Sequence, residues 1–366
     1  MTAERRSTLE DVARLAGVSL GSASRALSMP EQVKSATLEK VRHAVSQLGY
    51  VRNGAAQALA SRRTRTVATI YPTLSNPIFS VAIHELQQTL WKFGYQLLVA
   101  SHEYKPEREI ELLRTIVERG VDALVLVGTD HSSEVFELAR QYALPYVMTW
   151  SIDGSHHPHC VGFSYYDAAF ELASLAVKTG HQHIALCNGF EHTNERARAR
   201  AAGTRAALKA AGLSLDPSLV TEQPFNFEGG REAVRIFMDQ PMPPTVLICG
   251  TDLQAIGAID ECRRQGIRVP EDLSITGFDD IEHAAIVVPP LTTVKVPTEQ
   301  IGVLAAHRVV ALLEGKADQA VQPLETRVIV RESLAAPKPV QPGQEWCAAR
   351  TRSKAPIGSA GTQEKE

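Results

Sequence analysis

Polar and aromatic side chains directly follow several apolar runs that predict strands, and these side chains can recognise a small molecule. The residues in such positions are Ser75, Phe79, Trp150, Phe163 and Asp279. The Asp279 carboxylate, in the run Gly277-Phe-Asp-Asp280, can bind hydroxyl groups through charge-assisted hydrogen bonds. Aromatic faces can cover the apolar side of a ligand ring, and the helix amino terminus predicted at Asn76–Pro77 favours oxygen-rich ligands. These residue types predict a binding site for a small polar ligand.

Motifs for catalysis and for cofactor or metal binding are missing from the sequence. It contains no Walker A motif, no Gly-x-Gly-x-x-Gly fingerprint and no His-Glu-x-x-His motif. No serine or cysteine has the sequence context of a nucleophile elbow. His156, His157, His159 and Cys160 are close neighbours in one loop, which seldom gives the tetrahedral geometry of a metal site. We therefore expect a binding protein without cofactor or metal, and not an enzyme.

A pair of short helices is predicted near the amino terminus, between Thr8 and Leu27. Thr8 and Asp11 form a candidate capping box at the start of the first helix. Gly17 can end that helix because glycine tolerates a left-handed conformation, and Ser19 can cap the second. Two short amphipathic helices joined by a tight turn predict a helix-turn-helix, which binds the major groove of DNA.

The second helix of this pair carries the side chains expected to contact DNA. Arg25 is the best candidate for a bidentate contact to guanine. Ser22 and Ser24 are better suited to phosphate contacts. The alternative for Arg25 is a solvated or phosphate-pairing arginine, because many arginine contacts go to the DNA backbone.

Charge is distributed unevenly along the 366 residues, whose formal net charge is −3. Residues 1–65 hold 11 Lys+Arg against 5 Asp+Glu, and the remainder holds 27 against 36. A basic head on an acidic body fits a protein that binds phosphates with one part only. The sequence starts without a signal peptide and has no apolar run of transmembrane length. Together with cysteines that form no framework spacing, this predicts a cytoplasmic protein.

The rest of the chain divides into a linker, a large body and a tail. Asn53 can cap a short alanine-rich helix over Gly54–Ala60, too short to be stable alone, and the alternative is a plain flexible linker. From residue 66, strands alternate with helices, which predicts two doubly wound parallel-sheet lobes with a ligand cleft between them. Phe163 is expected after a short strand that begins the second lobe. The predicted parts are 8–52 (helix-turn-helix), 53–65 (hinge helix or linker), 66–335 (two-lobed body) and 336–366 (disordered tail).

These motifs resemble the LacI/GalR family of bacterial transcription repressors. The resemblance rests on TLEDVARLAGVS, SRAL, LGYVRN, NGAAQALAS and PPLTTV, and it extends from about Thr8 to Arg331. It implies a helix-turn-helix head, a hinge helix and a body like that of periplasmic sugar receptors. It further implies a homodimer that binds a near-palindromic DNA operator, with an affinity controlled by a small effector such as a sugar or sugar acid.

The resemblance also assigns roles to individual residues. Leu20 and Gly21 occupy the positions that read bases, and Leu59 matches a hinge leucine that enters the minor groove. The implied DNA-binding residues are Ser19, Leu20, Gly21, Ser22, Ser24, Arg25, Asn53, Ala56 and Leu59. Arg200 matches the effector-contacting arginine by its distance from Gly203. The implied effector-binding residues are Ser75, Phe79, Trp150, Phe163, Arg200, Phe227, Thr251 and Asp279.

Several alternatives stay open at this point. Leu59 can pack between hinge helices without entering DNA, and Phe163 and Phe227 can be core residues. Arg196, Arg198 and Arg200 can form a solvated helix face. For the whole chain, the alternatives are a solute-binding receptor with the same body, a sugar-kinase or dehydrogenase type of enzyme, and a regulator with a purine-type corepressor. The sequence does not give the sign of regulation.

Overall fold

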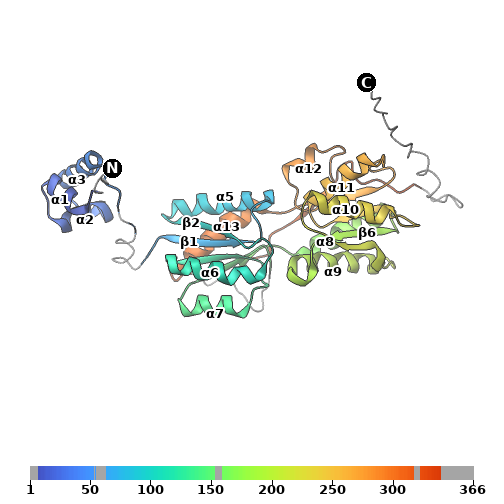
Figure 1. Cartoon of the computed structure of the whole chain (residues 1–366), viewed down its shortest axis with the longest axis horizontal. Coiled ribbons are helices and arrows are strands. Elements are labelled where there is room, and N and C mark those ends of the chain that lie inside the picture. The colour runs from blue at the N-terminus through green and yellow to red at the C-terminus, as the bar shows by residue number, and fades with distance from the viewer. Residues whose placement is uncertain (1–6, 53, 55–62, 153–158, 317–321, 339–366) are drawn as a thin grey trace, which may run out of the picture. The chain divides into compact units, whose positions relative to one another are not determined.

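The computed structural model describes residues 7–52, 54, 63–152, 159–316 and 322–338 (Figure 1). The chain forms two compact units, one ending at Arg65 and one beginning at Thr66. Most of the predicted hinge segment 53–65, including Asn53, Ala56 and Leu59, lies outside the described residues.

The first unit is a small three-helix domain. Its elements are α1 (Leu9–Ala16), α2 (Leu20–Ser28), the 3-10 turn η1 (Pro30–Gln32) and α3 (Ser35–Leu48). The predicted capping box is confirmed, because the Thr8 hydroxyl accepts from the Asp11 amide and the Asp11 carboxylate accepts from the Thr8 amide. Gly17 ends α1 at φ 64°, in the left-handed region. Val12, Ala23 and Val41 are fully buried and form the centre of the core.

The second unit contains two lobes, each built on a parallel sheet. The first sheet has the order β2-β1-β3-β4-β5 and the second has the order β7-β6-β8-β9. The strands of the first sheet are β1 (Thr66–Tyr71), β2 (Gln96–Ser101), β3 (Ala123–Val127), β4 (Tyr146–Thr149) and β5 (Cys160–Val161). Those of the second are β6 (Ile184–Asn188), β7 (Val220–Glu222), β8 (Val246–Cys249) and β9 (Ser274–Thr276).

Helices cover these sheets. The first lobe carries α5 (Pro77–Lys92), α6 (Pro106–Arg119), α7 (Ser133–Gln141) and α13 (Thr298–Leu313). The second carries α8 (Tyr165–Lys178), α9 (Glu195–Ala210), α10 (Phe227–Met238), α11 (Asp252–Arg264) and the short α12 (Glu282–Ile286), with turns η2 (Glu191–Thr193) and η3 (Pro217–Leu219). In the second lobe α8 packs against α9, and α10 packs against α11. The doubly wound architecture predicted from strand-helix alternation is confirmed.

The chain crosses between the lobes more than once. After β10 (Thr293–Lys295) it enters α13, which packs against α5 and the first sheet; Figure 1 shows α13 in orange beside the blue α5. Gly302 permits this packing, because a Cβ there would overlap the Ala82 carbonyl of α5. The chain then returns to β11 (Arg327–Ile329), which pairs antiparallel with β10.

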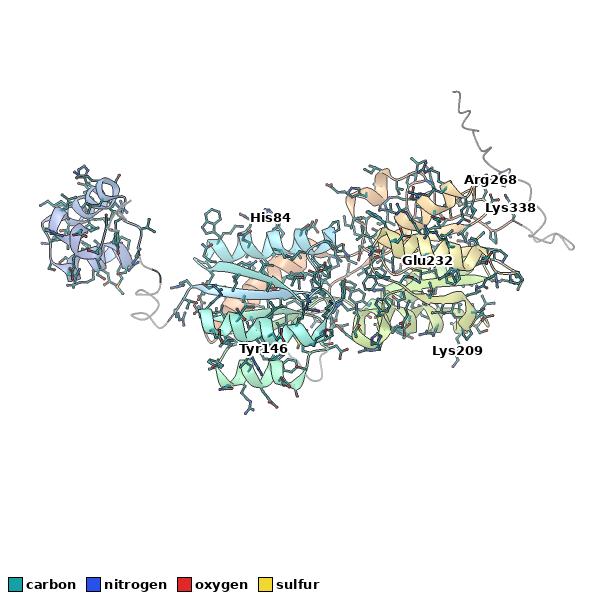
Figure 2. The ribbon with its side chains drawn as sticks, viewed as in Figure 1. His84, Tyr146, Lys209, Glu232, Arg268 and Lys338 are labelled. Carbon is teal, nitrogen blue, oxygen red and sulfur yellow. The ribbon has the colours of Figure 1, made fainter. Side chains whose placement is uncertain are left out.

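Two features differ from the sequence prediction. The short strand before Phe163 belongs to the first sheet and does not begin the second lobe, because β5 pairs with β4 in the register Thr149↔Val161. The ordered chain also continues past Ala336. Lys338 and Arg268, close together in Figure 2, both bind the Asp272 carboxylate at 2.7 Å. Residues 339–366 lie outside the described part. In the described ranges, no helix combines the length and apolar character that crossing a membrane requires.

Candidate functional site

The first candidate surface is the amino-terminal turn of α2 in the head. Leu20 is 47% exposed, and Gly21 and Arg25 are also exposed on this helix. Ser19 is the N-cap, because its Oγ accepts from the Ser22 amide at 3.1 Å and lies 2.8 Å from the Ser22 hydroxyl. The Arg25 Nε donates to the Gly21 carbonyl at 3.3 Å, so the guanidinium lies along the helix beside Gly21. The head residues predicted to contact DNA thus lie together at α2, while Ser19 also caps this helix.

Arg200, on α9, lies at the centre of the second candidate site. It is 6% exposed, and its guanidinium lies 5.2 Å from the ring centres of Tyr165 and Phe225 and 5.4 Å from that of Phe278. These cation–π contacts stabilise the charge. Within the described chain, however, Arg200 Nε has no hydrogen-bond partner. A buried guanidinium with an unused donor is costly unless a ligand completes its hydrogen bonds.

Asp279 faces the same region from the segment after β9. It is 6% exposed, adopts φ 127°, and its Oδ2 finds no hydrogen-bond partner in the part of the chain that the structure describes. Burial and the neighbouring Asp252 hold the Asp279 pKa well above its usual range, while Arg200 and a hydrogen bond from Asn76 act in the opposite direction. An unused acceptor therefore accompanies the unused donor of Arg200.

The first lobe contributes a strained turn after β2. Glu103 and Tyr104 have φ values of 51° and 54°, which non-glycine residues rarely adopt. The Tyr104 ring lies 5.6 Å from that of Phe225 in the second lobe, and burial raises the Tyr104 pKa to about 12. Trp150 (φ 68°) and Asp280 (φ 56°) are strained in the same way. Backbone strain of this kind often accompanies functional sites.

Other aromatic rings form an apolar layer next to these polar groups. Phe79 makes edge contacts with Tyr71 at 5.2 Å and with Trp150 at 5.1 Å. Phe163 lies 4.3 Å from Tyr165, which stacks on Phe278 at 5.6 Å. Phe79, Trp150 and Phe163 are all buried. Of these, Phe163 contacts the very rings that lie against Arg200.

The structure places some predicted effector residues differently. Phe225, and not Phe227, lies over Arg200. Asn226 is the N-cap of α10, so Phe227 is the first helical residue and is 45% exposed, whereas Phe225 precedes the cap. Thr251 is buried and caps α11, its Oγ1 accepting from the Gln254 amide at 3.3 Å. Ser75 is exposed, with its hydroxyl 2.9 Å from that of Thr73.

The arginines of α9 do not form a uniform solvated face. Arg196 and Arg200 are buried, so the solvated alternative is wrong for both, while Arg198 is exposed and paired with Asp130 at 2.8 Å. Four further residues of the site were not predicted from the sequence, namely Tyr104, Tyr165, Phe225 and Phe278. Phe278 adjoins Asp279 in the Gly277–Asp280 run and was the easiest of these to find. Tyr104 gave no local signal, because its position depends on an unusual turn.

Asp252, the first residue of α11, supports the segment that carries Asp279. It is fully buried; its Oδ2 accepts from the Ile281 amide at 2.9 Å, and its Oδ1 accepts from the Thr293 hydroxyl at 2.5 Å. Burial raises its pKa to about 7, against the lowering effect of these two hydrogen bonds. Asp252 thus ties α11 to the segments on both sides of α12.

We expect Asp252→Asn to make thermal stability less dependent on pH. The unfolded chain releases this proton near pH 4 and the folded chain near pH 7, so the contribution of Asp252 is present at pH 4 and is lost as the pH rises to about 7. Asparagine can accept from the Ile281 amide through its oxygen and donate to the Thr293 hydroxyl through its NH2 group, without titrating. Melting temperatures measured between pH 4 and pH 8 should therefore fall by several degrees less in the variant. The exposed Asp239→Asn should follow the wild-type profile, and identical profiles for Asp252→Asn and wild type would contradict the assignment.

Comparison with known proteins places both units. Residues 8–53 match the family described as bacterial regulatory proteins, lacI family, and residues 173–334 match a periplasmic binding protein-like domain. The HTH-type transcriptional regulator GntR of Pseudomonas aeruginosa is 34% identical over 314 residues, which cover 85% of this chain and 90% of that protein. The chain belongs to the lacI family.

Solved structures of similar proteins agree with this lacI-family assignment. A complex of the transcriptional regulator CelR with cellobiose is 30% identical, covers 90% of this chain and all of that one, and has a TM-score of 0.67. The Lac repressor dimer bound to operator and the anti-inducer ONPF is 25% identical, covers 91% of this chain and all of that one, and has a TM-score of 0.81. This lacI-family chain is a DNA-binding transcriptional regulator with an effector-binding body, and the predicted combination of head and two-lobed body is confirmed.

Proposed function

We propose that this regulator is a repressor whose affinity for a near-palindromic operator is controlled by a sugar or sugar acid bound between its lobes. The observation that supports this best is the pair of buried, incompletely bonded groups, Arg200 Nε and Asp279 Oδ2, among aromatic rings. A donor and an acceptor beside ring faces match a ligand that has hydroxyl or carboxylate groups and an apolar face. This site is assigned to binding and not to catalysis.

The proposed effector contacts come from both lobes. Arg200, Asp279, Tyr165, Phe225 and Phe278 belong to the second lobe, and Tyr104, Asn76 and Phe79 to the first. An effector held by both lobes favours one arrangement of the lobes over others. It can change operator affinity only by as much as its own affinity differs between those arrangements. A repressor of this kind acts in the cytoplasm, where its operator DNA is.

The proposed assembly is a homodimer. The exposed side of α5 carries Val81 and Trp91, the latter 65% exposed, at helical spacing with His84. His84 points outward from α5 in Figure 2. Exposed apolar side chains on one helix face favour contact with a second copy. A two-fold axis would then present two heads to the half-sites of an operator.

A binding selection followed by a ligand screen tests the proposed function. DNA fragments retained by the protein identify the operator, and fluorescence anisotropy then measures operator affinity with sugars, sugar acids and nucleobases. We expect one or more sugars or sugar acids to change the operator Kd. A response to nucleobases alone would support a purine-type corepressor instead. If the protein selects no sequence but binds sugars, the receptor alternative is correct.

Within this function, Arg25→Ala should reduce specific binding more than nonspecific binding. Loss of one bidentate contact to guanine costs about 1–3 kcal/mol, so the affinity for the best operator should fall by about 5–150-fold. Binding to random DNA should weaken much less at the same salt concentration. The matched control is Arg42→Ala, an exposed arginine on α3 of the same head, for which both affinities should fall equally. Equal losses with Arg25→Ala would show that Arg25 contacts phosphate only.

A further inference from the structure

A second group of contacts joins the two lobes next to the proposed effector site. Glu195, the first residue of α9 in the second lobe, reaches residues that follow β3 and β4 in the first lobe. Its Oε1 accepts from the Thr129 amide at 3.0 Å and from the Ser151 hydroxyl at 3.1 Å. The same oxygen accepts from Arg196 Nη1 at 2.9 Å. We call these contacts of Glu195 and Arg196 with Val127–Thr129 and Ser151 the lobe latch.

Burial makes the lobe latch strong. The side chains of Glu195 and Arg196 are 19% and 9% exposed, and Arg196 Nη1 also donates to the Val127 carbonyl at 3.4 Å. Although burial raises the Glu195 pKa, Arg196 and the two donors from the first lobe bring it below its usual range. Glu195 is therefore ionised at neutral pH, with its charge balanced inside the contact. Hydrogen bonds to a buried charged group contribute more than those between neutral groups, so the Thr129 and Ser151 donors of the first lobe are held strongly.

The first lobe is shaped to receive this pair. Gly128 has φ 92°, and a Cβ there would overlap Arg196 Nη1 and the Glu195 carboxylate. His131 Nε2 donates a hydrogen bond to the Gly128 carbonyl at 3.2 Å. His131 Nδ1 lies 2.9 Å from a carboxylate oxygen of Glu109, and both side chains are buried. The loop after β3, which contacts Glu195, is thus also held by the buried pair of His131 and Glu109.

We infer that the lobe latch holds the two lobes together in the absence of an effector. All of its contacts are between protein groups, so the closed arrangement needs no ligand to bridge the lobes. By keeping the lobes closed, the latch keeps Tyr104 of the first lobe near Phe225 and Arg200 of the second. It therefore raises the fraction of molecules that can bind an effector held by both lobes. This last consequence rests on the proposed function, whereas the latch itself does not.

Single-molecule energy transfer between the lobes of the full chain tests the inference directly. Dyes are attached at Arg140→Cys on α7 and Lys209→Cys on α9, both exposed; Lys209 points into solvent in Figure 2. Cys160, Cys187, Cys249 and Cys262 are buried, and Cys347→Ser removes the remaining thiol. Without effector or DNA, we expect one population for the wild type. Gly128→Ala and Glu195→Ala should each add a second population with at least about a tenth of the molecules.

The matched control is Arg198→Ala, which removes the exposed contact between the lobes at Asp130. It should leave a single population, because exposed ion pairs contribute little. Circular dichroism melting shows whether each variant is folded, and Glu195→Met, which has a similar length but offers no oxygen acceptor to Thr129 and Ser151, serves if Glu195→Ala is not. Wild-type distributions in Gly128→Ala and in the folded Glu195 variant would overturn the inference. Two populations in the wild type would also overturn it. The energy-transfer distributions do not depend on operator or effector binding. A failure of the proposed function would be seen in the operator selection and ligand screen instead.

Discussion

Arg200→Met should remove the response to the effector without destabilising the free protein. The guanidinium is buried under three aromatic rings and leaves a donor unused among the described residues. A charge-assisted hydrogen bond to a ligand contributes about 1.5–3 kcal/mol, so losing it should weaken effector binding about 10–150-fold. Because burial of an incompletely bonded charge is unfavourable, the melting temperature without effector should be unchanged or higher. Isothermal calorimetry and thermal unfolding measure the two effects.

The matched control for this prediction is Arg198→Met, on the same helix but exposed. It is the same substitution at an exposed position, and it should change effector affinity less than about twofold. A large loss of stability in Arg200→Met would indicate that the arginine has a structural role. Unchanged effector affinity would remove Arg200 from the site.

Val12→Asp should abolish operator binding and leave effector binding intact. Val12 is fully buried in the core of the head, which is a separate compact unit. Small domains have only a few kcal/mol of stability, and burying an unpaired carboxylate costs at least as much. The head should unfold, and operator affinity should fall at least about 100-fold. Anisotropy with operator DNA measures this loss, and the thermal shift caused by the effector should equal that of the wild type.

Leu15→Asp is the control for the Val12 variant. It places the same charge on the same helix, but at a side chain that is exposed. Operator affinity should fall by much less than in Val12→Asp. If Val12→Asp also eliminated the effector-induced thermal shift, the head and the body would depend on each other for folding, and the expectation that the body folds independently of the head would be wrong.

Local features of the fold were predictable from sequence because they depend on neighbouring residues. The Thr8–Asp11 capping box and the left-handed Gly17 follow from residue type and spacing alone. The buried strands are apolar throughout, as parallel sheets covered on both faces require. The return of α13 to the first lobe was not predictable in this way, since it depends on packing against α5, which is more than 200 positions earlier in the chain.

The site was predictable only in part, because several of its contacts join residues that are distant in the sequence. Asp279 and Arg200 were found because each lies in a recognisable segment. Phe225 and Phe227 flank Asn226 symmetrically, and only the position of the helix cap decides which ring lies over Arg200. Tyr104 depends on two consecutive positive φ angles. The lobe latch joins Thr129 to Glu195 across a sequence separation of 66 and had no local signal.

The most direct test of effector control through the proposed site at Arg200 and Asp279 is an operator titration followed by fluorescence anisotropy at fixed salt. Wild type and Arg200→Met are compared with and without the ligand identified in the screen. We expect the ligand to change the operator Kd of the wild type at least about fivefold. The Kd of Arg200→Met should equal that of the ligand-free wild type under both conditions. If the ligand shifts both proteins equally, or if no sugar or sugar acid shifts the wild type, control through this site is wrong.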